Sequence, residues 1–299
     1  MPAPAPDTVL AREESPPVPA SGRRRAAGAL RHRRAAIGVG LVLALAGAAA
    51  GAGWLAPHDP VASDLGRRLL APSAEYPLGT DWIGRCLLSR LLYGLRLTVL
   101  VGVVTVLAGG GLGVLLGLVA GFYGRLWETV IMRGTDLLLS FPYFLLTIVL
   151  VAVLGASLLN AMVAIAVWTT PHFVRVVRAV TLSLREREFV EAARALGRTE
   201  AGILLRHVLP GCAAPLVVQA SVFCAQNMLM SASLSFLGLG AQPPSPELGA
   251  MLAAGRAYLR VAPQVVAVPA AGIFVAVLAF NLVGDALRSV VDRRTPGRP

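Results

Sequence analysis

Five long stretches of this chain lack Asp, Glu, Lys and Arg, and their lengths predict which of them cross a membrane. They run from Ala35 to Ala56, Leu97 to Ala120, Leu137 to Val174, Val208 to Pro246 and Val261 to Gly284. A helix crosses a bilayer in about 20 residues, so the first, second and fifth are single spans. The third divides at Gly155-Ala156-Ser157 into spans at 137–154 and 158–175, and prolines confine one span of the fourth to about 212–235. The pattern predicts six transmembrane helices, with both chain ends on one side.

The composition agrees with this pattern. Hydrophobic residues make up 56% of the chain and charged residues only 14%, and the mean hydropathy is +0.70. A soluble fold would have to bury apolar runs that are longer than ordinary core helices. We therefore predict an all-α membrane protein.

The arginines indicate the orientation of the chain. All 27 basic residues are arginine: seven precede the first span, seven lie in a central loop from Arg175 to Arg206, four follow the last span, and the two long loops of opposite parity hold six. Basic residues stay on the cytoplasmic side, so both termini and the central loop are predicted to be cytoplasmic. The segments near Asp64 and Glu247 are predicted to be extracytoplasmic. The same rule accounts for most of the net charge of +11 without a nucleic-acid partner.

These assignments divide the chain into five segments. Residues 1–34, rich in Pro and Ala, form a disordered basic cytoplasmic tail, 35–56 the first transmembrane helix, and 57–94 an extracytoplasmic segment. Residues 95–285 form a core domain of five transmembrane helices, and 286–299 a cytoplasmic tail. The first span has the basic flank of a signal peptide but a longer apolar run, so we interpret it as retained.

The inventory of reactive side chains argues against catalysis. Without lysine the chain has neither a GxxxxGK phosphate loop nor a Schiff-base residue. The three cysteines form no CxxC pair and there is no HExxH. By the predicted topology His32, His172 and His207 are at cytoplasmic positions and His58 is external. We expect no catalytic residue, no metal site and no cofactor.

Two kinds of residue inside the predicted spans concern helix contacts. Gly113, Gly117 and Gly121 recur every four residues and predict a helix-packing face. Carboxylates are absent from the spans, but uncharged polar side chains are present: Asn160, Gln219, Gln226, Asn227 and Asn281. Because such groups are costly against lipid, they either form hydrogen bonds between helices or line a polar pathway.

The central loop contains a charged, helix-forming segment, REREFVEAARALGR. Phe189, Ala192, Ala193 and Leu196 recur at helical spacing and predict one apolar face, and Gly197 ends this helix. A second helix, TEAGILLRHVL, starts at the N-cap Thr199 and stops at Pro210. Such a pair either packs on its own bundle or docks a partner at the inner membrane face, and the alanine pair favours a partner that approaches closely.

The sequence EAARALGRTEAGILLRHVLP resembles the EAA loop of ABC importer permeases. The residues at the family's spacing are Glu191, Ala192, Ala193, Gly197, Ile203, Leu209 and Pro210. The segments YPLGTDWIGRCLLSRLLYGLR, MRGTDLLLSFP, SLSFLGLGAQPPSP and VLAFNLVGDALRSVVDRR are similar to the dipeptide, oligopeptide and nickel group, specifically its C-type subunit. The resemblance covers about Trp54 to Arg294.

The resemblance implies a type I ABC importer permease fold whose EAA loop, residues 185–210, is the coupling helix docked on an ATPase. It implies a non-catalytic subunit in the cell membrane that pairs with a homologous permease, binds two ATPases, and receives substrate from an extracytoplasmic binding protein. A secondary transporter or channel is the alternative class, but it would use ionisable groups in its spans for ion coupling.

The resemblance leaves the substrate open between peptides and nickel. Nickel prefers imidazole and other N, O or S ligands. The predicted spans offer no histidine and no carboxylate, so a metal would have to pass chelated or use Cys212 and Cys224, and we predict a short peptide as the cargo. A peptide needs a wide uncharged polar passage, which Gln219, Gln226, Asn227, Ser231 and Asn281 are expected to line. Three positions depart from the group: Cys86 replaces Asp, Ser231 replaces Glu and Leu248 replaces Trp.

Overall fold

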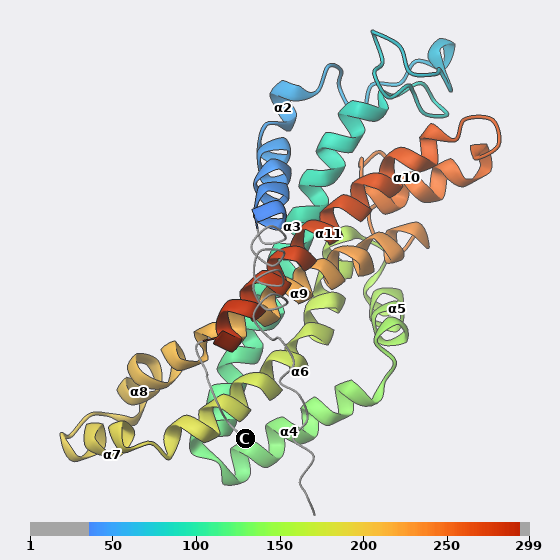
Figure 1. The fold of residues 1–299 in the computed structure, drawn as a ribbon. Helices are drawn as coiled ribbons and strands as arrows, with labels where there is room; N and C mark the ends of the chain where they lie inside the picture. The colour runs from blue at the N-terminus through green and yellow to red at the C-terminus, as the bar shows by residue number, and fades with distance from the viewer. Residues whose placement is uncertain (1–35, 294–299) are drawn as a thin grey trace, which may run out of the picture.

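The computed structural model describes residues 36–293, which form an elongated helical bundle without strands (Figure 1). The helices are Ala36–Ala50, α2 (Ala52–Leu55), α3 (Leu87–Tyr123), α4 (Arg125–Ser140), α5 (Tyr143–Leu154), α6 (Leu158–Arg185), α7 (Glu188–Ala195), α8 (Glu200–Ile203), α9 (Leu209–Phe236), α10 (Leu248–Gly255) and α11 (Gln264–Arg293). Helices α2 and α10 lie toward one end of the bundle, and α7 and α8 form the other end (Figure 1).

Most residues of the predicted apolar stretches lie in helices. Within the described residues four helices are long and apolar enough to cross a membrane: α3, α6, the continuous helix Glu200–Phe236, and α11. The pair α4 and α5 meets the same test of length and composition only when the two are taken together across a bend of 95°, and Ala36–Ala50 is a shorter apolar helix. The whole of the predicted 1–34 tail and residues 294–299 of the 286–299 tail lie outside the described residues.

One predicted span, 137–154, is wrong as a single straight helix. The chain leaves helical geometry at Phe141, and α4 and α5 meet at an angle of 95°. The cause is local: Pro142 has no N–H to donate, and the residue before a proline is driven into extended geometry, as Phe141 is at φ −86° and ψ 138°. Helix α5 has only 12 residues, about 18 Å, so it cannot cross a bilayer alone.

The predicted glycine face is confirmed and forms the contact between α3 and α6. A methyl carbon built on Gly109, Gly113 or Gly117 would lie 2.4, 2.6 or 2.8 Å from the backbone oxygens of Ala166, Thr170 and Val174, respectively. At Gly121 it would lie 2.7 Å from Thr181 Cβ. Glycines four residues apart on α3 thus lie against residues four apart on α6. Because glycine has no side chain, the two helix backbones come into direct contact.

The helix after Thr199 does not stop at Pro210, contrary to the sequence prediction. It continues as one helix from Glu200 to Phe236. Residues Leu204–Val208 form a π-helical turn, in which the N–H of Leu209 donates to the oxygen of Leu204. This wider turn precedes the proline, whose ring would otherwise clash with the carbonyl four residues earlier.

Residues 57–86 fold onto the start of α3. The Asp81 carboxylate accepts hydrogen bonds from the backbone N–H groups of Ile83 and Arg85, and the Arg85 Nε donates to it at 2.6 Å. Arg90 Nη1 donates to the oxygen of Pro60 at 2.9 Å. Cys86 is the N-cap of α3 but its side chain makes no capping bond.

Packing explains why Leu248 stands where the group that the sequence resembles has Trp. Its side chain is fully buried between two glycines, since a methyl carbon built on Gly94 or Gly272 would lie 2.5 or 3.1 Å from its methyl groups. The space that two glycines leave on α3 and α11 therefore accommodates leucine.

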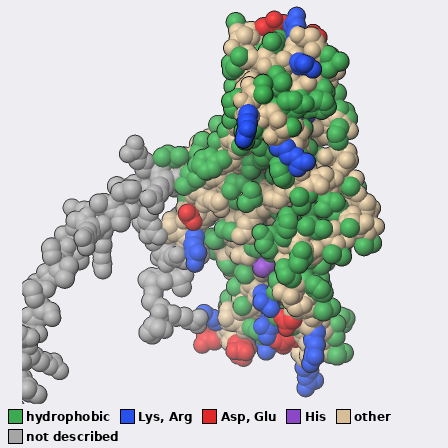
Figure 2. Space-filling model, turned by 90° about the vertical axis from the view of Figure 1, so that its right-hand side faces the viewer, with side chains coloured by type: hydrophobic (Ala, Val, Ile, Leu, Met, Phe, Trp, Pro, Cys, Tyr) green, Lys and Arg blue, Asp and Glu red, His purple; other side chains and the backbone are tan. Residues whose placement is uncertain are grey.

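The surface carries the signature of a membrane-spanning body. Figure 2 shows hydrophobic side chains over most of the middle of one face, with acidic and basic side chains concentrated toward its ends. Exposed apolar residues on several of the long helices, such as Leu107, Val153 and Phe274, have no contact partner that buries them. Lipid or another subunit is required to cover them.

Candidate docking segment and cavities

The turn between α7 and α8 is built from the residues that predicted it. Gly197 has a positive φ of +75°, a region that favours glycine. The N–H of Gly197 donates to the oxygen of Arg194 and that of Arg198 to the oxygen of Ala193, which is a Schellman motif. Thr199 then caps α8 by accepting a hydrogen bond from the N–H of Gly202. Both local predictions, the end of one helix and the start of the next, are confirmed.

An ion pair closes the same turn from the side. Arg194 Nε and Nη2 donate to Glu200 Oε1 and Oε2 at 2.8 and 3.1 Å. The hydrogen bond to Glu200 raises the pKa of Arg194. The Arg194 guanidinium also lies 5.7 Å from the ring centre of Phe122 at the end of α3. These contacts hold α7, α8 and the bundle in one arrangement.

The docking segment, residues 185–210, buries one side and exposes the other. Val190, Ala193 and Ile203 pack against the ends of α3 and α6. On the outer side Phe189, Ala192 and Leu196 are exposed, Leu196 by 84%. The predicted apolar face is therefore divided, because Ala193 points inward while its neighbours point outward. An apolar ridge at the tip of the molecule is left without a cover within residues 36–293.

The residues that match the spacing of the EAA loop all lie in this segment, but they differ in exposure. Glu191, Ala192 and Gly197 are exposed on α7 and its turn, whereas Ala193 and Ile203 are buried. Leu209 is half-buried and Pro210 exposed at the start of α9.

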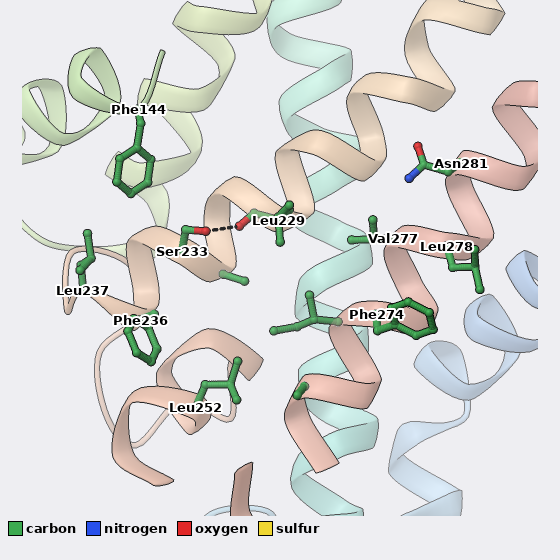
Figure 3. A pocket seen from close by; sticks show the side chains of 13 residues that line it. Phe144, Leu229, Ser233, Phe236, Leu237, Leu252, Phe274, Val277, Leu278 and Asn281 are labelled. Atoms are coloured by element: carbon green, nitrogen blue, oxygen red, sulfur yellow. Dashed lines mark hydrogen bonds between the residues drawn. The ribbon is translucent and has the colours of Figure 1, made fainter. Parts of the chain in front are cut away.

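A large apolar cavity lies toward the end of the bundle opposite α7 and α8. Its volume is about 640 Å³, and it is lined by residues of α5, α9, α10 and α11 (Figure 3). Phe144 lies across the cavity from Asn281 in Figure 3. The polar side chains that line it are Ser233, whose hydroxyl donates to the oxygen of Leu229, and Asn281. We call this the apolar cavity.

A second cavity of about 640 Å³ lies between α5, α6 and α9. It shares Phe144, Leu229 and Ser233 with the apolar cavity, so the two adjoin along one face of α9. Its other lining residues include four rings and one amide: Tyr143, Trp168, His172, Phe223 and Gln226. We call this the aromatic cavity.

The aromatic cavity corrects the sequence analysis. His172 was placed at a cytoplasmic position, but it lies near the middle of the long helix α6 and lines a cavity between helices. The interpretation of spans without histidine was therefore wrong. The signal was present in the sequence as Trp168 and His172, one turn apart within an apolar stretch.

The predicted pathway residues separate into different environments. Gln226 lines the aromatic cavity and Asn281 the apolar cavity. Ser231 is buried, and its hydroxyl has no partner within the described residues. Gln219 is half-buried and lines neither cavity. Asn160 donates to the oxygens of Leu154 and Gly155 and so joins α5 to α6.

Asn227 is fully buried and joins three helices. Its Nδ2 donates to Thr105 Oγ1 of α3 at 2.9 Å and to Thr169 Oγ1 of α6 at 3.1 Å. Both hydroxyls also donate to carbonyls of their own helices. Of the two interpretations of buried polar groups, this geometry matches the hydrogen bond between helices.

We expect Asn227→Ala to destabilise the protein by about 1–2 kcal/mol, because two hydrogen bonds between helices are lost. The adjacent Gln226→Ala is the matched control, since Gln226 is exposed in the cavity and should change unfolding by less than about 0.5 kcal/mol. Thermal unfolding of the detergent-solubilised protein measures both. Equal destabilisation by the two variants would contradict the assignment.

Comparison with known proteins agrees with this geometry. Residues 113–296 match the family of binding-protein-dependent transport system inner membrane components. The chain belongs to this family. It is thus the inner-membrane permease subunit of an ABC importer, and the family's name implies a binding-protein partner.

Named relatives and a solved structure extend the match. The glutathione transport system permease protein GsiD of Escherichia coli O6:K15:H31 is 43% identical over 247 residues, 82% of each chain. The dipeptide transport system permease protein DppC of Alkalihalophilus pseudofirmus is 46% identical over 225 residues, 75% of this chain and 74% of its own. A structure titled inward facing conformations of the MetNI methionine ABC transporter shares the fold, with a TM-score of 0.53 and 22% identity over 67% of this chain and 95% of that one.

Proposed function

We propose that this chain is the permease subunit through which an ABC importer moves peptides. The observation that carries the proposal is identity of 43% and 46% to permeases named for glutathione and dipeptides, over at least 74% of each chain. The aromatic cavity supports it, because the Gln226 amide can form a hydrogen bond with a peptide group and the rings can contact an apolar side chain. Within residues 36–293 no three metal-ligating side chains lie together, which gives nickel no comparable support.

The subunit acts mechanically and catalyses no reaction itself. Its exposed ridge at Phe189, Ala192 and Leu196 docks in a groove of an ATPase subunit, and the complex contains two ATPases. Closure of the ATPases moves the docking segment, and the Arg194–Glu200 pair and the buried side of the segment transmit that movement to α3 and α6. The residues assigned to coupling are Glu191, Ala192, Ala193, Gly197, Ile203, Leu209 and Pro210.

A homologous second permease completes the pathway. The apolar cavity and the exposed apolar side chains on α9 and α11 support this heterodimer, since a surface of this kind is covered in the membrane by lipid or by another helix. Of the predicted pathway side chains, Gln226 and Asn281 border the cavities, and we assign the pathway to these two.

The docking segment and both termini lie in the cytoplasm, and residues 57–86 and 237–263 face the binding protein. The arginine distribution supports this orientation, and so does the separation of α7 and α8 from α2 and α10 at opposite ends of the bundle (Figure 1).

The proposal is tested in a strain that lacks this chain and requires one amino acid. We expect the strain to lose growth when that amino acid is supplied as a dipeptide and to keep growth on the free amino acid. Nickel-dependent urease activity, measured in the same strain, should be unchanged. Glutathione as the sole sulfur source tests whether the peptide class includes it.

The reverse pattern would overturn the proposal. Loss of urease activity that excess nickel restores, with normal growth on dipeptides, would assign the permease to nickel. Complementation by the plasmid-borne gene is the control for effects on neighbouring genes.

A further inference from the structure

The aromatic cavity is lined by a cluster of four rings: Tyr143, Trp168, His172 and Phe223. Trp168 lies at its centre, with ring-centre distances of 5.3 Å to Tyr143, 4.6 Å to His172 and 5.6 Å to Phe223. His172 and Phe223 are also 4.9 Å apart. The rings come from α5, α6 and α9, so three helices meet at this cluster.

The break between α4 and α5 forms part of the cluster. Tyr143 is the first residue of α5 and directly follows the Phe141-Pro142 break. An unbroken helix would continue in the direction of α4, 95° away from α5. In transporters, broken helices occur where the backbone borders a substrate cavity rather than lipid.

Two polar side chains lie beside the rings, His172 and Gln226. His172 Nε2 is buried and has no hydrogen-bond partner within the described residues. The Gln226 amide borders the same cavity, and its side chain is exposed. No lining residue is charged, and the nearest cation on α6, Arg175, is paired with Asp136 at 2.7 Å.

We propose that the aromatic cavity is a substrate site that binds neutral peptides with a large apolar or aromatic side chain. That side chain stacks on Trp168 and Phe223, and a peptide amide bonds to the exposed amide of Gln226. A cavity of about 640 Å³ falls within the usual range of about 300–1,000 Å³ for small-ligand sites. The inference rests on the proposed peptide transport and adds a selectivity that this chain itself imposes.

The first test compares uptake of Ala-Phe and Ala-Ala by the complete transporter in proteoliposomes, with saturating binding protein. The binding protein is the same in every assay, so a change in the ratio of the two rates belongs to the permease. In Trp168→Leu the rate ratio of Ala-Phe to Ala-Ala should fall roughly three- to tenfold, because one aromatic contact is lost. In Gln226→Leu both rates should fall together, since both peptides carry an amide.

Phe274→Leu is the matched control, because Phe274 lines the apolar cavity and its replacement also removes a ring. It should leave the ratio unchanged. Equal ratios in wild type and Trp168→Leu, or the same fall in Phe274→Leu, would overturn the site while leaving peptide transport intact.

A binding measurement separates the site from the proposed function. The chain has four tryptophans, and replacing Trp54, Trp82 and Trp127 by Phe leaves Trp168. When the partner permease is also made free of tryptophan, the fluorescence of the purified pair comes from Trp168 alone. Ala-Phe should shift the Trp168 emission at concentrations at which Ala-Ala does not. A shift without peptide uptake would keep the site and reject the transport proposal. No shift would overturn the site, whatever the uptake.

Discussion

Gly113→Val should prevent α3 from packing on α6 and sharply reduce the amount of folded protein. The first added carbon would lie 2.6 Å from both Phe173 Cβ and the oxygen of Thr170. The backbone oxygen cannot move without displacing α6, and Val is branched at this carbon. Overpacking of this kind costs typically about 1–3 kcal/mol, and more where backbone is involved. Size-exclusion chromatography after graded heating measures the loss.

Gly111→Val is the matched control two residues away on the same helix. A carbon added there meets nothing within 4 Å, so this variant should elute and unfold like the wild type. If Gly113→Val were as stable as Gly111→Val, the close contact between α3 and α6 would be wrong. Equal loss in both would indicate a general intolerance of valine in α3 instead.

Gly197→Val should abolish most transport while leaving the protein inserted in the membrane. With φ at +75°, a β-branched residue is strained by about 1–3 kcal/mol at this position. A carbon added there meets nothing within 4 Å, so the strain comes from the backbone alone. The turn relaxes by changing the angle between α7 and α8, which moves the exposed ridge away from the ATPase. Uptake rate and membrane content, measured in parallel, separate coupling from insertion.

Two controls isolate this backbone effect. Gly197→Asn should keep most activity, because asparagine adopts positive φ more readily than other residues. Gly134→Val on α4 should be neutral, because its φ is ordinary and a carbon added there meets nothing within 4 Å. Full transport by Gly197→Val would show that the turn geometry does not matter for coupling.

Crosslinking reports directly on docking. All three native cysteines are buried, which keeps the background low. A cysteine at Ala192 or Leu196 should crosslink to the ATPase, whereas one at the buried Ala193 should not. In Gly197→Val the crosslinks should weaken. Crosslinks at Ala193 equal to those at Ala192 would contradict the placement of the segment.

Local chemistry explains what the sequence determined on its own. Long uncharged runs predict spans because each backbone polar group must be satisfied within a helix in lipid. The Gly197 turn and the Thr199 cap depend on the dihedral angles and hydrogen bonds of a few adjacent residues, so their residue types identify them. The glycine spacing on α3 was recognisable for the same reason, since four residues bring side chains to one helix face.

The tertiary structure determined whether each side of a helix contacts another helix, borders a cavity or is exposed. Gln226 and Asn227 are adjacent amides, yet one borders a cavity and the other joins three helices, because about 100° of helix rotation separates them. Ala192 and Ala193 divide between an exposed ridge and a buried contact in the same way. His172 lines the aromatic cavity because α5, α6 and α9 meet there and bring Tyr143 and Phe223 beside Trp168. Hydrophobic pattern determines that a helix is buried in a membrane, but contacts between distant helices determine its rotation.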